Sequence, residues 1–273
     1  MPQHPSDLDI SADSVWTIDR IIERSRRSTG ARLPASFLRA DSERDPALAR
    51  LIRGGRGGGV RTKLYMSKVL LAGSSHAHPM YGRNTIFDVS GPSWARALAL
   101  PDPEHAGARR IADAQNQLAD MKLVQLARQA SHPPIVRLLH PSGSGDDWVE
   151  PGSPYVRIPL DIWTNRWLWY LTGKELAVLI ATLDLCGGKG VSRTGGPQAL
   201  SGTPRRRYGM SEDTWRLASA SLEQIGLIET DSAIVGTDLM TPRRRKRYLA
   251  LPEMLDRVAP LPRPKLAESS TPG

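Results

Sequence analysis

The strongest constraint on the fold of this chain is an internal repeat, in which two halves carry the same series of apolar faces. The pattern is clearest in the second half, where residues 174–185 and 211–225 each have apolar side chains at helical spacing. Ser211 suits the N-cap of the latter helix. Residues 227–229 and 247–251 follow as two strands. The second half is therefore predicted to contain helices followed by a β-hairpin.

The first half contains the same elements in the same order. Residues 63–72, 94–100 and 109–121 are predicted helices, and residues 122–124 and 135–139 are predicted strands. Because two matches in register rarely arise by chance, we expect two winged helix-turn-helix domains in tandem. The fold class would be mainly α with small β-hairpins (α+β). The apolar positions that align at one constant offset are Ile111, Ala114, Leu118 and Met121 with Trp215, Ala218, Leu222 and Ile225.

Breaks in this pattern indicate the domain boundaries. Residues 13–27 predict a short amphipathic helix, and the glycine-rich run at 53–59 predicts a flexible joint. The Ser-Gly stretch at 141–145 separates the two halves, and residues 1–12 are expected to be disordered. The expected regions are an N-terminal extension with the helix and joint (1–59), a first winged-helix module (60–145), a second winged-helix module (153–258) and a disordered tail (259–273).

The distribution of charge indicates the class of partner. The formal net charge is +9, and eight of the cations lie in two runs, Arg205–Arg207 and Arg243–Arg247. No acidic residue interrupts either run. Because clustered cations repel one another, such runs are stabilised by a polyanion. The expected partner is double-stranded DNA.

Several segments of the second half resemble known proteins. Tyr155–Trp163, Leu171–Leu179, Tyr208–Thr214, Leu222–Ile228 and Arg243–Leu249 are similar to winged-helix proteins of actinobacterial plasmids and mobile elements. The order of the two halves also resembles the tandem winged-helix layout of plasmid replication initiators. This resemblance implies replication initiation or transcriptional regulation of a plasmid or mobile element. It covers residues 153–255 well and residues 60–140 loosely.

The helix at 211–225 is the expected recognition helix of the second module. The guanidinium of Arg216 on its non-core face suits a guanine edge. Basic residues on either side are expected to contact phosphates or to form a wing that enters a minor groove. A solvated helix face and solvated charge runs are the alternatives. The predicted DNA contacts of this module are Thr214, Arg216, Ser219, Arg205, Arg206, Arg207, Arg243, Arg244, Arg245, Lys246 and Arg247.

In the first module the predicted recognition face carries Arg109, Arg110 and Asn116, and the Asn116 amide suits adenine. Arg137 would belong to its wing, together with Arg128 and His132. Gly107–Arg110 occupies the positions that match the cap sequence Ser211–Thr214, so this module lacks that N-cap. Base reading and a solvated surface remain alternatives here, because nearby carboxylates dilute the charge.

No catalytic, metal or cofactor site is expected, and the chain is predicted not to be an enzyme. The lone Cys186 lies in an apolar run and is expected to be inert. Gly173-Lys174 lacks the upstream glycine of a phosphate-binding loop, and His76 and His78 have no third ligand at a typical spacing. The aromatic cluster at 163–170 is expected to pack in the core, with Trp169 facing outward.

The N-terminal segment lacks the basic and apolar blocks of a signal peptide, and no stretch approaches ~18 uninterrupted apolar residues. The expected location is therefore the cytoplasm, on the nucleoid, as a monomer or dimer. Replication or transcription proteins are possible further partners. The main alternative function is an assembly protein whose winged helices bind other proteins and contact DNA only through charge. A nucleic-acid enzyme with a dispersed site is a less favoured alternative.

Overall fold

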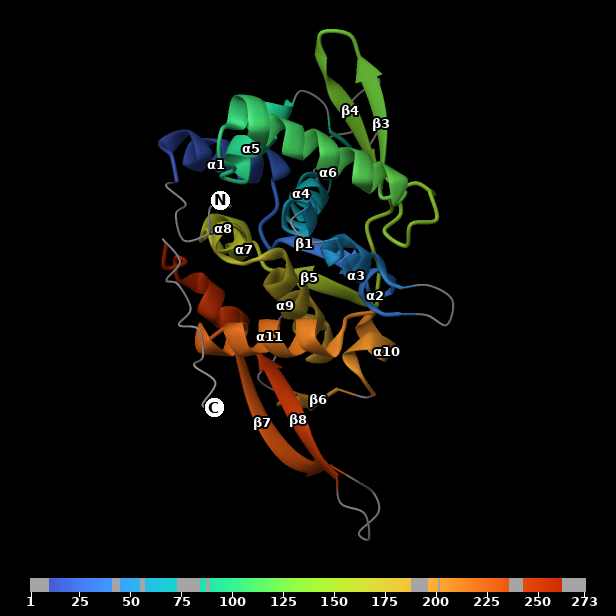
Figure 1. Cartoon of the computed structure of the whole chain (residues 1–273), viewed down its shortest axis with the longest axis vertical. Helices are drawn as coiled ribbons and strands as arrows, with labels where there is room; N and C mark the ends of the chain where they lie inside the picture. Colours follow the sequence, from blue (N-terminus) through green and yellow to red (C-terminus); the bar gives the residue numbers. More distant parts are fainter. Residues whose placement is uncertain are drawn as a thin grey trace, which may run out of the picture.

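The structure is a computed structural model of the whole chain. It describes residues 10–40, 45–54, 57–72, 84–86, 89–187, 196–200, 202–235 and 243–261, and the side chains of Gln129, Val235 and Arg243 are left out of the description. The described residues form helices and three short antiparallel sheets (Figure 1). Within these residues, no helix combines the length and the apolar character needed to cross a membrane.

The element order repeats along almost the whole chain. The first half contains β1 (Ala31–Pro34), α2 (Ala35–Leu38), α3 (Ala47–Ile52), α4 (Gly57–Ala72), β2 (Thr85–Ile86), α5 (Gly91–Ala97), η2 (Pro103–Gly107), α6 (Ala108–Asp120), β3 (Val124–Gln129) and β4 (His132–Leu138). The second half contains β5 (Tyr155–Ile158), α7 (Asp161–Thr164), α8 (Trp167–Tyr170), α9 (Gly173–Leu185), β6 (Gln198–Ala199), α10 (Pro204–Tyr208), α11 (Glu212–Gln224), β7 (Ile228–Val235) and β8 (Arg243–Ala250). Apart from η2, each element of one half has a counterpart in the other. Helix α1 (Ala12–Ser25) precedes the repeat, and η3 (Pro252–Asp256) follows it.

Hydrogen bonds at the ends of α6 and α11 show that the repeat is structural. The backbone N–H of Leu123 donates to the carbonyl of Leu118 at 2.9 Å, and Leu227 donates to Leu222 at the same distance. The preceding residues, Lys122 and Gly226, both have positive φ. These pairs keep the offset predicted from the sequence. The helix and hairpin boundaries of the two halves are therefore set by the same local geometry.

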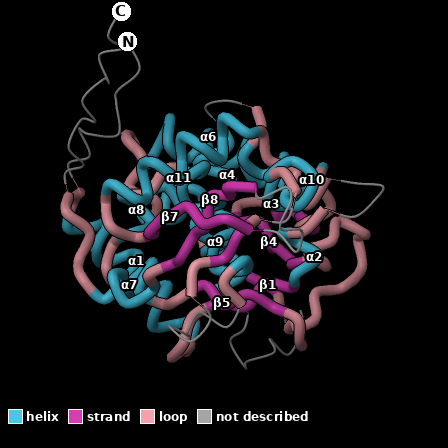
Figure 2. The backbone as a smooth tube through the Cα atoms, turned by 90° about the horizontal axis from the view of Figure 1, so that it is seen from below, coloured by secondary structure: helices cyan, strands magenta, loops and turns pink. Residues whose placement is uncertain are grey.

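The sheets follow the same repeat. Their strand orders are β2-β4-β3 and β6-β8-β7, and β1 pairs with β5 across the two halves. The two hairpins project from opposite ends of the molecule (Figure 1). Helices α6 and α11 lie along one edge of Figure 2, with β1 and β5 along the opposite edge. Both long helices therefore belong to one face of the molecule.

A single hydrophobic core runs through both halves, from Ile18 to Ala259. Helix α9 is buried around most of its circumference and packs against α4 and α11. The backbones of α4 and α9 meet at glycines: a Cβ added to Gly173 would lie 2.6 Å from the Cα of Gly59. Only residues without side chains allow this approach. The two halves thus share a core.

This packing corrects the predicted boundary at residue 60. Residues 31–52 are not part of a separate extension, because β1, α2 and α3 are the counterparts of β5, α7 and α8. The glycine run predicted as a flexible joint instead forms the first turn of α4 at 57–59. A Cβ on Gly58 would approach the carbonyl oxygen of Ile52 to 2.9 Å. The glycines permit close packing here.

Each half also supports the other through its short helices. The indole N–H of Trp169, on α8, donates to the carbonyl oxygen of Ala97 at 2.8 Å, at the end of α5. Trp169 is buried, which corrects the expectation that it faces outward. In the reciprocal contact, the backbone N–H of Ala40 donates to the carbonyl of Arg207 at 2.8 Å. The Arg39 guanidinium binds the buried carboxylate of Asp184 on α9 at 2.8 and 3.0 Å.

The predicted N-cap at Ser211 is confirmed, and the structure adds a capping box at α9 that the sequence analysis did not predict. Thr172 and Glu175 form a capping box at α9, and the Ser211 hydroxyl accepts a hydrogen bond from the backbone N–H of Thr214 at 3.2 Å. The predicted N-terminal helix is α1, capped by Ser11, so the expected disorder does not reach residues 10–12. The rest of that segment lies outside the described residues. Of the predicted C-terminal tail, Ala259 is buried and residues 262–273 lie outside the description.

Candidate nucleic-acid interface

Helix α11 is held by aromatic packing. The Trp215 ring stacks on Tyr208 of α10, with centroids 5.6 Å apart, and meets Tyr248 of β8 edge-on at 5.4 Å. Buried Glu175 of α9 accepts a hydrogen bond from Ser221 at 2.5 Å on the same side of the helix. These contacts fix the rotation of α11 about its axis. They determine which side chains face outward.

The outward stripe of α11 differs from the prediction at one position. Ser219 is only 1% exposed, because it follows Trp215 by four residues and shares the buried side of the helix with it. It therefore cannot contact DNA from this position, which corrects its assignment. Leu217, which the sequence analysis did not single out, is 59% exposed. The exposed stripe at 3.6-residue spacing consists of Asp213, Arg216, Leu217, Ala220 and Gln224.

Arg216 stands in the middle of this stripe. Its side chain is 70% exposed and lies 3.3 Å from the Asp213 carboxylate, one turn earlier. An exposed ion pair of this kind contributes about 0.2–1 kcal/mol, so a stronger acceptor can displace Asp213. Thr214 is half-buried, and its hydroxyl accepts a hydrogen bond from the Ser211 hydroxyl at 2.9 Å. Of the residues predicted on this helix, Arg216 is the best placed to bind a ligand.

The basic run ahead of α11 forms helix α10, where Arg205 and Arg206 are exposed. Arg207 differs, because its Nε donates to the Tyr208 hydroxyl at 3.0 Å and its guanidinium lies 3.9 Å from Asp184. Burial raises the pKa of Tyr208, which stays protonated and donates to Asp184 at 2.9 Å. Arg207 therefore belongs to the support of α10. Arg205 and Arg206 form no ion pair within the described part of the chain.

The second basic run forms the start of β8, rather than the loop that precedes it. In the register of β7 with β8, Arg244 pairs with Ile234, Lys246 with Ser232 and Arg247 with Asp231. The Arg247 guanidinium binds both oxygens of Asp231 and holds the pKa of that carboxyl below its usual range. A counter-charge for this run therefore comes from the neighbouring strand β7.

Lys246 has a similar counter-charge, with its Nζ 3.9 Å from the Glu223 carboxylate of α11. Arg244 and Arg245 form no ion pair among the described residues. The side chain of Arg243 lies outside the described side chains, so its predicted contact is not placed. The structure thus divides the basic run into paired and unpaired cations. A ligand of the paired cations would have to displace a carboxylate, whereas a ligand of the unpaired ones would not.

The equivalent face of the first half has different chemistry. Arg109, Arg110 and Asn116 are exposed on α6, together with Asp113. This helix starts earlier than predicted, because the π-helical turn η2 extends it and Asp102 caps that turn by accepting from the Ala106 N–H at 3.0 Å. The missing cap at 107–110 is therefore replaced upstream.

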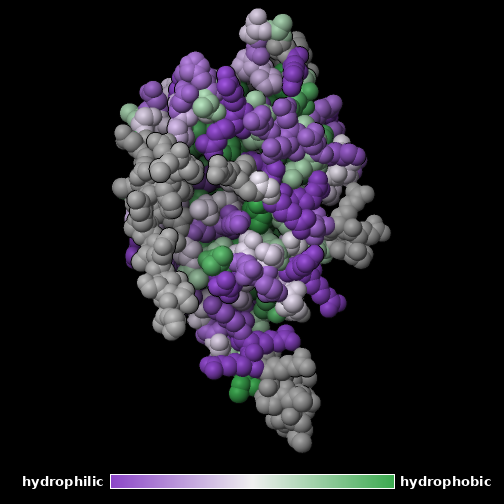
Figure 3. All heavy atoms as spheres, viewed as in Figure 1, coloured by the Kyte–Doolittle hydropathy of each residue, from purple (hydrophilic) through white to green (hydrophobic). Residues whose placement is uncertain are grey.

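In the first hairpin, Arg137 is exposed but its Nη2 lies 2.6 Å from the Asp147 carboxylate. Arg128 and His132 are exposed on β3 and β4. The first half thus presents mixed charges, and the second half presents more unpaired cations. The face that carries α6 and α11 has a largely hydrophilic described surface (Figure 3).

No family model matches the chain, and neither does any curated protein or solved structure with which it was compared.

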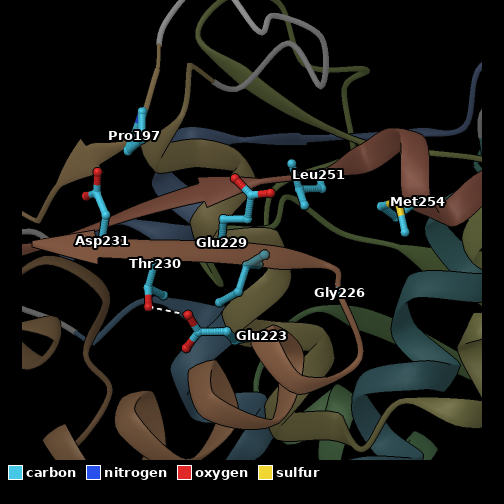
Figure 4. A pocket seen from close by; sticks show the side chains of 9 residues that line it. Pro197, Glu223, Gly226, Glu229, Thr230, Asp231, Leu251 and Met254 are labelled. Atoms are coloured by element: carbon cyan, nitrogen blue, oxygen red, sulfur yellow. Dashed lines mark hydrogen bonds between the residues drawn. The ribbon is translucent and has the colours of Figure 1, made fainter.

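One pocket lies beside β7, and its carboxylates are Glu223, Glu229 and Asp231 (Figure 4). Glu223 accepts a hydrogen bond from the Thr230 hydroxyl, and Asp231 binds Arg247. Among the described residues, no three His, Cys, Asp or Glu side chains are grouped as metal ligands. His76 and His78 lie outside this part of the chain. Burial raises the pKa of the half-buried Cys186, which disfavours its thiolate.

Proposed function

We propose that this protein binds double-stranded DNA through two winged helices in tandem. The observation that supports this most is the placement of two equivalent helices, α6 and α11, on one face, each followed by a β-hairpin. Their outward sides carry polar residues, with the exposed Leu217 on α11, and exposed arginines lie on or beside them. A helix of this kind fits the major groove, and a hairpin beside it reaches the backbone or the minor groove.

The relative directions of the helices support one docking mode. In Figure 1, α6 starts beside α5 and α11 starts beside α10, on opposite sides of the face. The helices therefore run in opposite directions, as in a dimer with two-fold symmetry. Two recognition helices arranged in this way would enter successive major grooves, roughly 34–36 Å apart. A single chain would then bind as a symmetric dimer does.

The biological process is proposed from the resemblance of the second half to plasmid and mobile-element proteins. Initiation of replication and regulation of transcription both require a protein that selects one duplex sequence. The assembly function remains the second candidate for the first half, because Arg137 there is paired with Asp147 and Asp113 faces outward beside Asn116. That half could bind a partner protein while the second half holds DNA.

The test separates base reading from phosphate binding. Duplexes selected from a random library provide the preferred site. Arg216→Ala is expected to weaken binding to that site by roughly 1–3 kcal/mol and to relax preference at about one base pair. Binding to random duplex should change little. Arg244→Ala with Arg245→Ala should weaken binding to every duplex and make the salt dependence shallower by up to about two units, at about 0.9 per phosphate.

Arg32→Ala on β1 is the matched control, because it removes one cation from the face opposite α6 and α11. It should leave both affinities unchanged. If Arg216→Ala and the hairpin double mutant reduce specific and random binding by the same factor, α11 does not read bases. A titration at several salt concentrations measures all three variants.

A further inference from the structure

Leu217 is an exposed apolar residue at the centre of the proposed reading surface. It is 59% exposed, and the described residues on either side of it along the outward stripe are Asp213, Arg216 and Ala220. Trp215 and Leu222 fix the rotation of the helix, so Leu217 cannot turn into the core without breaking that packing. An isolated exposed leucine is common on protein surfaces. Leu217 differs from such a residue because it lies next to Arg216 on the outward stripe of α11.

The surroundings of Leu217 are charged, which restricts the ligand. Arg216 is adjacent in sequence, and Arg205 and Arg206 are exposed on α10, the short helix that precedes α11 and contacts it. A protein partner with a large apolar patch would bury these cations at a cost. A polyanion that also offers a small apolar group would suit both. The major-groove edge of DNA offers one such group, the C5-methyl of thymine.

We propose that Leu217 contacts a thymine methyl group in the major groove and makes α11 select thymine beside the base pair that Arg216 contacts. This inference rests on the proposed function and adds a specificity-determining residue to it. The equivalent residue of α6, at the same offset, is Asp113. A carboxylate has no affinity for a methyl group and suits a cytosine amine instead. We therefore expect the preference for thymine only in the half-site that α11 contacts, and not in the half-site that α6 contacts.

The experiment replaces each thymine of the selected duplex, one at a time, by deoxyuridine, which lacks only the methyl group. For the unaltered protein, one replacement in the half-site of α11 should weaken binding roughly three- to fivefold, the loss expected for one buried methyl group. Leu217→Ala should weaken binding to the thymine duplex by a similar or larger factor and should no longer distinguish deoxyuridine from thymine. Leu217→Met keeps an apolar side chain and should retain the distinction.

The outcomes separate this inference from the proposed function. A protein that selects no duplex sequence refutes the proposed function, and the inference with it. A protein that binds its selected duplex equally well with thymine and deoxyuridine at every position refutes the inference alone. The same holds if Leu217→Ala keeps the full sensitivity to deoxyuridine. Thermal melting checks that Leu217→Ala is folded, which is expected because the side chain is exposed.

Discussion

The two halves of the molecule share an architecture and differ in the chemistry of one face. Trp215 and Leu222 on α11 match Ile111 and Leu118 on α6, and all four are buried. The outward residues do not match: Asp213, Arg216, Leu217 and Ala220 correspond to Arg109, Ala112, Asp113 and Asn116. The repeat is therefore retained in its core and changed on its outward face, so the two faces offer different chemistry to any ligand. For a DNA-binding protein, this means two unlike half-sites.

The two central helices, α9 and α4, also differ in how their buried charged groups are satisfied. In α9 the buried carboxylates are satisfied: Glu175 bonds to Thr172 and Ser221, and Asp184 to Arg39 and Tyr208. In α4 the ammonium of Lys68 is fully buried, has no hydrogen-bond partner among the described residues and lies 4.6 Å from the centre of the Trp94 ring. Burial lowers the pKa of Lys68 to about 7. The buried carboxylates of α9 are thus better satisfied than the buried ammonium of α4.

The largest expected effect comes from separating the halves. A fragment of residues 153–273 should show no cooperative thermal melt, because it would expose α9 and Trp169 and lose the pairing of β5 with β1. The sequence pattern alone favours the opposite result. Co-expressed fragments 1–152 and 153–273 should bind each other and restore the melt. A stable 153–273 fragment with a melt of its own would contradict the shared core.

Removing the buried charge of α4 is expected to have the next largest effect. Lys68→Met should stabilise the protein by about 2–4 kcal/mol at pH 6, where the ammonium is charged in both folded and unfolded chains. Between pH 7 and 10.5, only the unfolded chain keeps the proton, so the stability of the unaltered protein rises with pH and the gain shrinks. Chemical denaturation at several pH values measures this, and a gain independent of pH would contradict a buried ammonium.

Transferring the outward residues of α11 to α6 tests the difference between the two faces. Arg109→Asp, Ala112→Arg, Asp113→Leu and Asn116→Ala together should convert the selected site into an inverted repeat, with preferences changed by roughly 1–3 kcal/mol per altered base pair. All four positions are exposed, so stability should change little. Selection from a random duplex library gives the result. An unchanged site would show that α6 does not read DNA and would favour the assembly function for the first half.

The smallest effect is expected from freeing a paired arginine in each hairpin. Asp231→Asn should release Arg247, steepen the salt dependence of duplex binding by about 0.9 units and strengthen binding at low salt. Asp147→Asn should do the same for Arg137 if the first hairpin touches DNA. A response to Asp231→Asn alone would limit phosphate contact to the second hairpin. No response to either would place both hairpins away from the duplex.

Local signals in the sequence predicted the elements of the repeat. The apolar spacing of α6 and α11 and the cap at Ser211 depend on neighbouring residues only, and the structure confirms them. The burial of Ser219 follows from its i+4 spacing to Trp215, so this local pattern also carries it, whereas the packing of Trp215 against Tyr208 and Tyr248 comes from other elements. Asp231 neutralises Arg247 through strand register, which no local pattern fixes.

The prediction of a flexible joint at 53–59 is wrong for a related reason. The composition of this glycine run is that of a linker, but its function in the fold depends on Gly173, more than a hundred residues away. Whether glycine gives freedom or close contact cannot be decided without its neighbour. The same applies to Trp169, whose partner carbonyl lies in the other half. Contacts between the halves were therefore the part of the fold that the sequence did not predict.

The contact of Gly59 with Gly173 has a consequence for the geometry of any target. Two domains joined by a flexible linker tolerate variable spacing between their half-sites. Two halves whose backbones are in contact instead hold α6 and α11 at a fixed distance and orientation. B-DNA turns once in about 10–10.5 base pairs, so adding five base pairs between half-sites would carry the second one to the far side of the duplex. If the proposed function holds, inserting five base pairs prevents α6 and α11 from binding their half-sites at the same time. Inserting a full turn does not restore this binding.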